Sequence, residues 1–221
     1  MNGPPSLIVD LDGTLIDSAP LIAGIVNRML ADRGSLRTVA ATDARAFLTQ
    51  GGSQLVTALL GDDFADLDRD LTDFRARYAS LRTPADCLFP GVRNGLAALS
   101  ALGVRMAICS NKPHSLCDKI VADLALGQHF VAIVGSADGT PLKPAPDLAL
   151  RALAQLGTTA ADCLYVGDSD VDRQTAASAG IGFLFVTYGY AESDQQIDAL
   201  ARFDRFDQLA PYIAANERRV A

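Results

Sequence analysis

The chain has 221 residues, a length that suits one domain with a smaller insertion better than two equal domains. Its net charge is −7 with only three lysines, so we expect no basic patch that would bind nucleic acid or an anionic membrane. Apolar residues make up 49% of the chain, enough for a packed core, and no apolar run is long enough to span a bilayer.

The N-terminal segment and the cysteines favour a cytoplasmic protein. The first six residues, MNGPPS, contain neither the basic nor the apolar region of a signal peptide. None of the four cysteines is arranged as CxxC, and Cys109 and Cys163 lie in apolar runs, as buried thiols of a reducing compartment would. With only two histidines, a histidine-rich metal site is excluded and any metal must be bound by oxygen; we expect His114 at the surface or at a helix end.

Residues 6–18, SLIVDLDGTLIDS, carry the strongest chemical signal at the start of the chain. The apolar residues 7–9 predict a buried strand that ends at Asp10, and Asp12 follows before Gly13 permits a sharp turn. Two carboxylates this close repel each other unless they share a cation or a proton. We therefore predict a carboxylate nucleophile, a second carboxylate for proton transfer, and a Mg²⁺ ion that both help to hold.

The next segment, residues 17–84, is predicted to be entirely helical. Apolar residues recur on one face of a first helix over residues 21–30. Two shorter helices are expected over residues 43–50 and 53–60, and a longer one over residues 64–81, whose apolar stripe we interpret as core packing. No predicted strand interrupts the segment, so it forms a helical block inserted after the first strand.

From residue 89 onward, strands and helices alternate. The apolar runs predict strands at residues 104–109, 131–135, 163–166 and 182–187, helices at 90–102, 113–126, 146–156 and 172–179, and a terminal helix within 200–213. Short apolar strands between helices indicate a doubly wound, Rossmann-like α/β fold with a parallel sheet. Such sheets bind ligands beyond the carboxyl ends of their strands, where the strand order reverses.

Polar residues follow the predicted strands at that end. Ser110 could offer its hydroxyl to a phosphoryl oxygen, and the backbone amide of Asn111 could add a second donor. Lys143 could neutralise charge on a transferring group, while Lys112 is either a second phosphate contact or a surface lysine. After the strand at 163–166, Asp168 could share a cation with Asp10. Asp172 could hold a metal-bound water.

Four motifs that span nearly the whole chain, in order, resemble those of the haloacid dehalogenase-like (HAD) hydrolase superfamily: DLDGTL at Asp10 and Asp12, Ser110, Lys143, and GDSxxD at Asp168 and Asp172. The longer run DLDGTLIDSAP is similar to the phosphoglycolate phosphatase branch. The resemblance implies that Asp10 attacks phosphorus and that Asp12 is the general acid and base. It also implies that both, with Asp168 and Asp172, hold Mg²⁺, Asp12 through its backbone carbonyl.

The resemblance further implies a core domain of residues 1–16 and 85–221 with a small helical cap of residues 17–84. The Gly51-Gly52-Ser53 turn resembles the glycine-containing specificity loop of the phosphoglycolate phosphatases, or is an ordinary turn between helices. Arg45 could pair with a substrate carboxylate. The expected substrate contacts are therefore Thr14, Asn111, Gly51, Gly52, Ser53 and Arg45. The TYGY run at residues 187–190 also resembles that branch but departs from its usual Asn/Tyr-rich form.

These features imply a cytoplasmic Mg²⁺-dependent phosphatase, a monomer or homodimer, that acts on a small phosphomonoester, with 2-phosphoglycolate as the first candidate. The alternatives are a sugar-phosphate phosphatase, a nucleotidase, a phosphoglucomutase-like enzyme, or a signalling module phosphorylated on Asp10. Asp12 disfavours a dehalogenase, which needs no acid for its leaving group. The absence of lysine from residues 17–84 disfavours a phosphonatase that forms a Schiff base.

Overall fold

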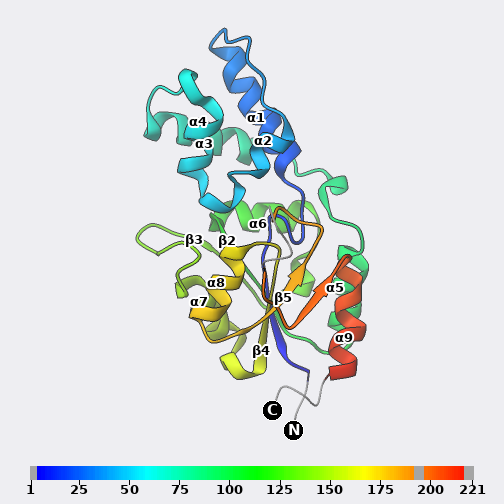
Figure 1. Ribbon diagram of the computed structural model, residues 1–221. Coiled ribbons are helices and arrows are strands. Elements are labelled where there is room, and N and C mark those ends of the chain that lie inside the picture. Colours follow the sequence, from blue (N-terminus) through cyan, green and yellow to red (C-terminus); the bar gives the residue numbers. More distant parts are fainter. Residues whose placement is uncertain (1–3, 192–196, 217–221) are drawn as a thin grey trace. The chain divides into compact units, whose positions relative to one another are not determined.

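The computed structural model describes residues 4–191 and 197–216, arranged in two compact units (Figure 1). One unit consists of Met1–Asp17 and Ala85–Ala221, and the other of Ser18–Pro84. The first three residues of the MNGPPS segment, on which the signal-peptide expectation rests, lie outside the described residues. Among the described helices, none is long and apolar enough to cross a membrane.

The first unit is built on a six-stranded parallel sheet. Its strands are β1 (Ser6–Val9), β2 (Met106–Pro113), β3 (Ala132–Ser136), β4 (Cys163–Gly167), β5 (Gly182–Val186) and β6 (Ala201–Phe203). They lie in the order β3-β2-β1-β4-β5-β6, so the order reverses at β1. β1 pairs with β2 on one edge and β4 on the other and is fully buried, which explains the apolar run of residues 7–9.

Helices cover both faces of this sheet: α5 (Val92–Ala101), α6 (His114–Asp123), α7 (Asp147–Leu156), α8 (Asp170–Ser178) and α9 (Leu209–Asn216). α7 and α8 lie on one side of the sheet, and α5 and α9 on the other (Figure 1). On the α7 side, Ile8 and Tyr165 of the sheet pack with Leu148 and Ala152 in one buried cluster. The predicted doubly wound, Rossmann-like α/β fold is therefore confirmed.

Every regular element of Ser18–Pro84 is helical. The unit contains α1 (Ala19–Asp32), α2 (Ala41–Arg45), α3 (Gly52–Leu60) and α4 (Leu67–Ser80), with 3-10 turns at Leu48–Gln50 and Gly61–Asp63. Phe74 and Tyr78 of α4 are buried, as the predicted core packing requires, but Leu67 of the same apolar stripe is 41% exposed, so the packing covers only part of the stripe. α4 begins after residue 64 because the Asp66 side chain accepts a hydrogen bond from the Arg69 N–H at 2.9 Å and so caps the helix.

Two of the predicted helices are present but differ in extent. The helix expected over residues 43–50 ends at Arg45 and is followed by a separate 3-10 turn. The terminal helix begins only at Leu209, because residues 201–203 form β6 and pair with β5, Val186 opposite Phe203. A three-residue strand is too short to show a period, so its partner strand determines it. His114 is the first residue of α6 and is half exposed, as expected.

Candidate active site

The carboxyl ends of β1 and β4 bring together motifs from opposite ends of the sequence. The two strands pair with Val9 opposite Val166, and the Asp10 N–H donates to the Val166 carbonyl at 3.0 Å. Asp168 directly follows β4, and Asp172 lies in the first turn of α8. One carboxylate oxygen from each of Asp10, Asp168 and Asp172 lies within 4.8 Å of the others. The site thus forms where the strand order reverses, as the sequence predicts.

This carboxylate cluster is buried and short of positive charge. Asp10, Asp168 and Asp172 are 6%, 1% and 0% exposed, and the Lys143 Nζ lies 2.8 Å from Asp10 Oδ1 and 2.7 Å from Asp172 Oδ1. Burial and the charge of Asp172 raise the pKa of Asp10 to about 7, although Lys143 opposes the shift. Burial and the charges of Asp172 and Asp10 raise the pKa of Asp168 well above its usual value. One ammonium therefore does not balance three carboxylates.

The donor set fits a hard divalent cation. Among the residues that the structure describes, Asp10, Asp168 and Asp172 form the cluster with metal-ligand spacing, and it offers only oxygen. Hard cations bind carboxylate oxygens in preference to nitrogen or sulfur. A bound cation would also offset the repulsion within the cluster, which explains why three acidic side chains are buried together.

Thr14 and the loop after β5 hold Asp168 in place. The Thr14 hydroxyl donates to Asp168 Oδ1 at 3.0 Å, and the Tyr190 backbone N–H donates to Oδ2 at 2.6 Å. A Cβ atom on Gly13 or on Gly189 would lie 2.2 Å from an atom of Asp168, so only glycine fits at either position. Thr14 is fully buried, and its hydroxyl binds a carboxylate of the cluster, while contact of Thr14 with substrate stays a prediction.

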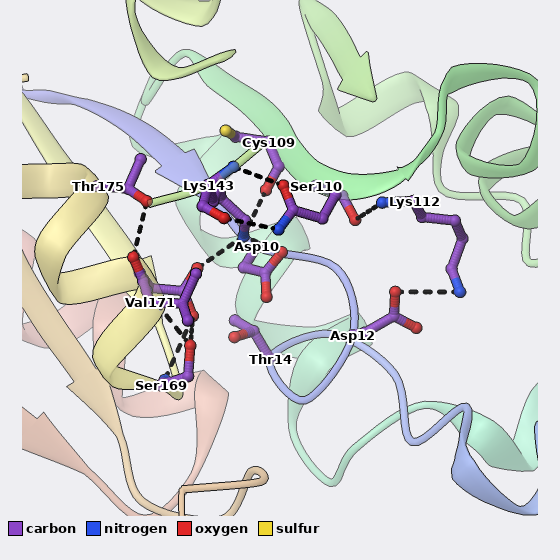
Figure 2. Close-up of polar contacts among 12 residues, drawn as sticks. Asp10, Asp12, Thr14, Cys109, Ser110, Lys112, Lys143, Ser169, Val171 and Thr175 are labelled. Carbon is purple, nitrogen blue, oxygen red and sulfur yellow. Dashed lines mark hydrogen bonds and ion pairs between the residues drawn. The ribbon is translucent and has the colours of Figure 1, made fainter. Parts of the chain in front are cut away.

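Lys143 is held by hydrogen bonds at its backbone and at its ammonium. Its backbone N–H donates to Asn111 Oδ1 at 2.7 Å, and Asn111 Nδ2 donates to the Lys143 carbonyl at 3.1 Å. At the other end its ammonium lies between Asp10 and Asp172. Figure 2 shows the lysine beside Asp10. The Lys143 Nζ also donates to the carbonyl of Cys109 at 3.2 Å, the residue before Ser110 in β2. The predicted catalytic residues Asp10 and Lys143 are therefore in direct contact, and Ser110 follows a residue that Lys143 contacts.

Asp12 points away from that cluster and lies beside Lys112 (Figure 2). The Lys112 Nζ is 3.1 Å from Asp12 Oδ2, with the two side chains 8% and 12% exposed. Lys112 is therefore not a surface lysine, and that alternative is wrong. Ser110 is buried, and its Oγ accepts a hydrogen bond from the Lys112 N–H at 3.1 Å. The first motif thus separates its two carboxylates into different environments.

Two further residues, neither of them predicted from the sequence, support the carboxylate cluster. The Tyr165 hydroxyl in β4 accepts a hydrogen bond from the Lys143 Nζ at 3.3 Å and lies 3.3 Å from Asp172 Oδ1. The Ser169 hydroxyl donates to Asp172 Oδ2 at 2.6 Å. Tyr165 lies in an apolar strand, so the sequence predicts a core residue. Ser169 lies inside the GDSxxD motif, which is the signal that could have identified it.

The predicted substrate contacts of the helical unit lie around one interhelical turn. Arg45 is the last residue of α2 and is exposed, while Gly51 directly precedes α3 and Gly52 and Ser53 begin it. Gly51 has a φ of 86°, a conformation that favours glycine. The turn therefore has a structural reason for its first glycine, and contact of these four residues with substrate stays a prediction.

The sequence and fold match known proteins over most of the chain. A phosphoglycolate phosphatase of Rhodobacter capsulatus is 37% identical over 214 residues, covering 93% of this chain and 94% of that protein. One from Cupriavidus necator is 38% identical over 190 residues, covering 84% and 82%. Among solved structures, a haloacid dehalogenase-like family hydrolase of Streptococcus pneumoniae has a TM-score of 0.80 at 23% identity, covering 96% of this chain and 99% of that one.

A second solved structure, CbbY from Rhodobacter sphaeroides in complex with phosphate, has a TM-score of 0.77 at 20% identity, covering 93% of this chain and 96% of that one. Both structural matches show the same fold. The sequence model of the haloacid dehalogenase-like hydrolases matches residues 6–180, which include all four motifs and the whole carboxylate cluster. Because the family match, the relatives and the fold agree, the chain belongs to the haloacid dehalogenase-like hydrolase family.

Proposed function

We propose that this protein is a Mg²⁺-dependent phosphatase that hydrolyses 2-phosphoglycolate through a phosphoaspartate at Asp10. The observation that carries the proposal is the position of Asp10, a carboxylate at the end of β1 that is 2.8 Å from the Lys143 ammonium and clustered with Asp168 and Asp172. The names of the relatives, which are 37% and 38% identical over most of this chain, support the choice of substrate.

In the first half-reaction, an oxygen of Asp10 attacks phosphorus and the bond between phosphorus and the ester oxygen breaks. Asp12, in its acid form, gives its proton to the leaving alkoxide. Lys143 offsets the charge on the phosphoryl oxygens, and the Ser110 hydroxyl and the Asn111 backbone N–H donate hydrogen bonds to them. Separate environments for Asp10 and Asp12 support this division of roles, since only Asp10 lies in the carboxylate cluster.

In the second half-reaction, a water molecule attacks the phosphorus of the phosphoaspartate. Asp12, now a carboxylate, takes a proton from this water, and the bond between phosphorus and the Asp10 oxygen breaks. Inorganic phosphate leaves, Asp10 regains its charge, and Asp12 is again protonated for the next turnover. One side chain thus serves as acid and then as base.

Asp10, Asp168 and Asp172, with the backbone carbonyl of Asp12, are the residues that we propose hold the metal ion. When bound, Mg²⁺ would screen charge on the phosphoryl group and among the carboxylates. The buried cluster with its single ammonium supports this assignment.

Removal of the metal is expected to abolish turnover. Without a cation, the three carboxylates would repel the dianionic phosphoryl group, and only Lys143 would oppose that repulsion. The measurement is phosphate release by the purified enzyme after treatment with EDTA, followed by titration with MgCl₂. Activity should return with added Mg²⁺. Full activity in excess chelator would contradict the metal assignment.

We propose that Ser18–Pro84 lies within a cap domain, residues 17–84, and that residues 1–16 and 85–221 form the core domain. Closure of a small cap would exclude water until the phosphoenzyme has formed. The exposed Arg45 at the end of α2 would then pair with the substrate carboxylate, and the turn of Gly51, Gly52 and Ser53 would contact the same substrate. The division of the chain into two compact units supports the cap.

Substrate selection is expected to favour a short acidic ester. The segment 17–84 has no lysine, and a small cap leaves little room for a bulky group. We expect kcat/KM for 2-phosphoglycolate to exceed that for hexose phosphates and nucleoside monophosphates at least about tenfold, or about 1.4 kcal/mol. Assays of released phosphate over a panel of esters would measure this. If a hexose phosphate or a nucleotide is preferred, the enzyme is a different phosphatase of the same family.

The proposed enzyme acts on a small molecule as a monomer or homodimer in the cytoplasm. Its four cysteines, at residues 87, 109, 117 and 163, are buried free thiols. Burial raises the pKa of Cys109, Cys117 and Cys163 to about 12, so they are unreactive thiols at neutral pH. This state of the cysteines is typical of proteins in a reducing compartment.

A further inference from the structure

We propose that Asn111 is a positioning residue whose side chain places the Lys143 ammonium, and that this side chain contributes to the reaction only through that lysine. The inference deepens the proposed function, because it rests on Lys143 being the cation that offsets phosphoryl charge. The side chain of Asn111 thus binds the Lys143 backbone, while its backbone N–H remains the predicted phosphate donor.

The backbone around Lys143 lacks the support of regular structure. The lysine lies between β3 and α7, and residues 137–146 contain no helix or strand. Within this segment, the Asn111 side chain binds both polar backbone atoms of Lys143, accepting from its N–H at 2.7 Å and donating to its carbonyl at 3.1 Å. Two hydrogen bonds to one residue fix both its position and its rotation, whereas one bond would leave the rotation open.

The ammonium of Lys143 has to lie between two buried carboxylates. It lies 2.8 Å from Asp10 Oδ1 and 2.7 Å from Asp172 Oδ1, and all three residues are buried. The Lys143 side chain is only 4% exposed, so the atoms packed around it leave it little freedom to compensate for a displaced Cα. A misplacement of about 1 Å at a catalytic group can cost on the order of 10²-fold in rate. The Asn111 side-chain amide therefore affects the reaction through the position of the Lys143 ammonium.

Asn111 also aligns two parts of the phosphate site. It directly follows Ser110 in β2, so the strand that presents the hydroxyl also anchors the segment that presents the ammonium. A side chain that does this needs one donor and one acceptor in a plane. Asparagine offers both at this length. An alanine would remove both hydrogen bonds without adding charge.

The chain provides a matched control for the loss of this bonding pattern. Asn27 of α1 accepts from the Val39 N–H at 2.7 Å and donates to the Val39 carbonyl at 3.0 Å, the same two-bond pairing with one residue. This pair holds together two segments of Ser18–Pro84 and involves none of the residues assigned to the reaction. Asn27→Ala therefore reports what the lost hydrogen bonds do to folding alone.

The first measurement compares kcat, KM and melting temperature for Asn111→Ala and Asn27→Ala. We expect both variants to melt at a lower temperature than wild type. Asn111→Ala should lose about 10- to 100-fold in kcat with a smaller change in KM, because a displaced Lys143 affects the transition state most. Asn27→Ala should keep kcat within about twofold. If Asn111→Ala is recovered unfolded, Asn111→Ser takes its place throughout.

The second measurement is a double-mutant cycle with Lys143→Met, using single-turnover phosphoryl transfer from p-nitrophenyl phosphate. In the Lys143→Met background, Asn111→Ala should change the rate by less than about twofold, since the group that Asn111 positions is gone. Effects that multiply, or full kcat in Asn111→Ala, would overturn the inference. If wild type releases no phosphate from any ester, or Lys143→Met is fully active, the proposed function itself fails.

Discussion

Replacement of Asp10 by asparagine is expected to abolish turnover and all covalent labelling of the protein by phosphate. The amide is nearly the same size as the carboxylate but is a far weaker nucleophile, so the bond to phosphorus cannot form. The change also removes one of the two carboxylates that flank the Lys143 ammonium, at 2.8 Å, and one proposed metal ligand. The measurement is phosphate release, combined with mass spectrometry after rapid quench.

Asp170→Asn is the matched control for that experiment. Asp170 stands in the same first turn of α8 as Asp172, but its side chain is 53% exposed and pairs with Arg173 at 2.6 Å. An exposed ion pair of this kind contributes little, so the control should keep full activity. Phosphate found on a residue other than Asp10 in the wild-type enzyme would show that the nucleophile is wrongly assigned.

Replacement of Asp12 by asparagine is expected to reduce turnover at least about 10²-fold, as loss of a general acid and base does. With p-nitrophenyl phosphate, whose leaving group needs little protonation, the first half-reaction should persist while the second lacks its base. The variant should therefore accumulate phosphoenzyme at Asp10, which rapid-quench mass spectrometry would detect.

The Asp12 variant should still bind Mg²⁺, since the proposed metal contact of this residue is its backbone carbonyl. Calorimetric titration with MgCl₂ would check that the site is intact. Its side chain pairs with Lys112 at 3.1 Å, away from the carboxylate cluster, so the cluster should be unchanged. Undiminished turnover in this variant would mean that another group moves the proton.

The sequence by itself determined the family, the α/β class and the residues of the four motifs. Buried parallel strands need apolar runs, and residues 7–9 and 163–166 show them directly. Because carboxyl ends of parallel strands meet at one edge, Asp10 and Asp168 could be placed together from the sequence alone. The boundaries of short elements could not be predicted, and β6 depends on pairing with β5 rather than on its own pattern.

Only the tertiary structure decided what the polar residues around those motifs bind. The sequence places Thr14 beside the first motif, but its hydroxyl binds Asp168, and Lys112 is buried against Asp12. Likewise, Tyr165 reads as a core residue, and the contact of Asn111 with Lys143 joins positions 32 residues apart. Hydrogen bonds between such distant positions leave no local period in a sequence, since they depend on where the strands and loops carry each side chain.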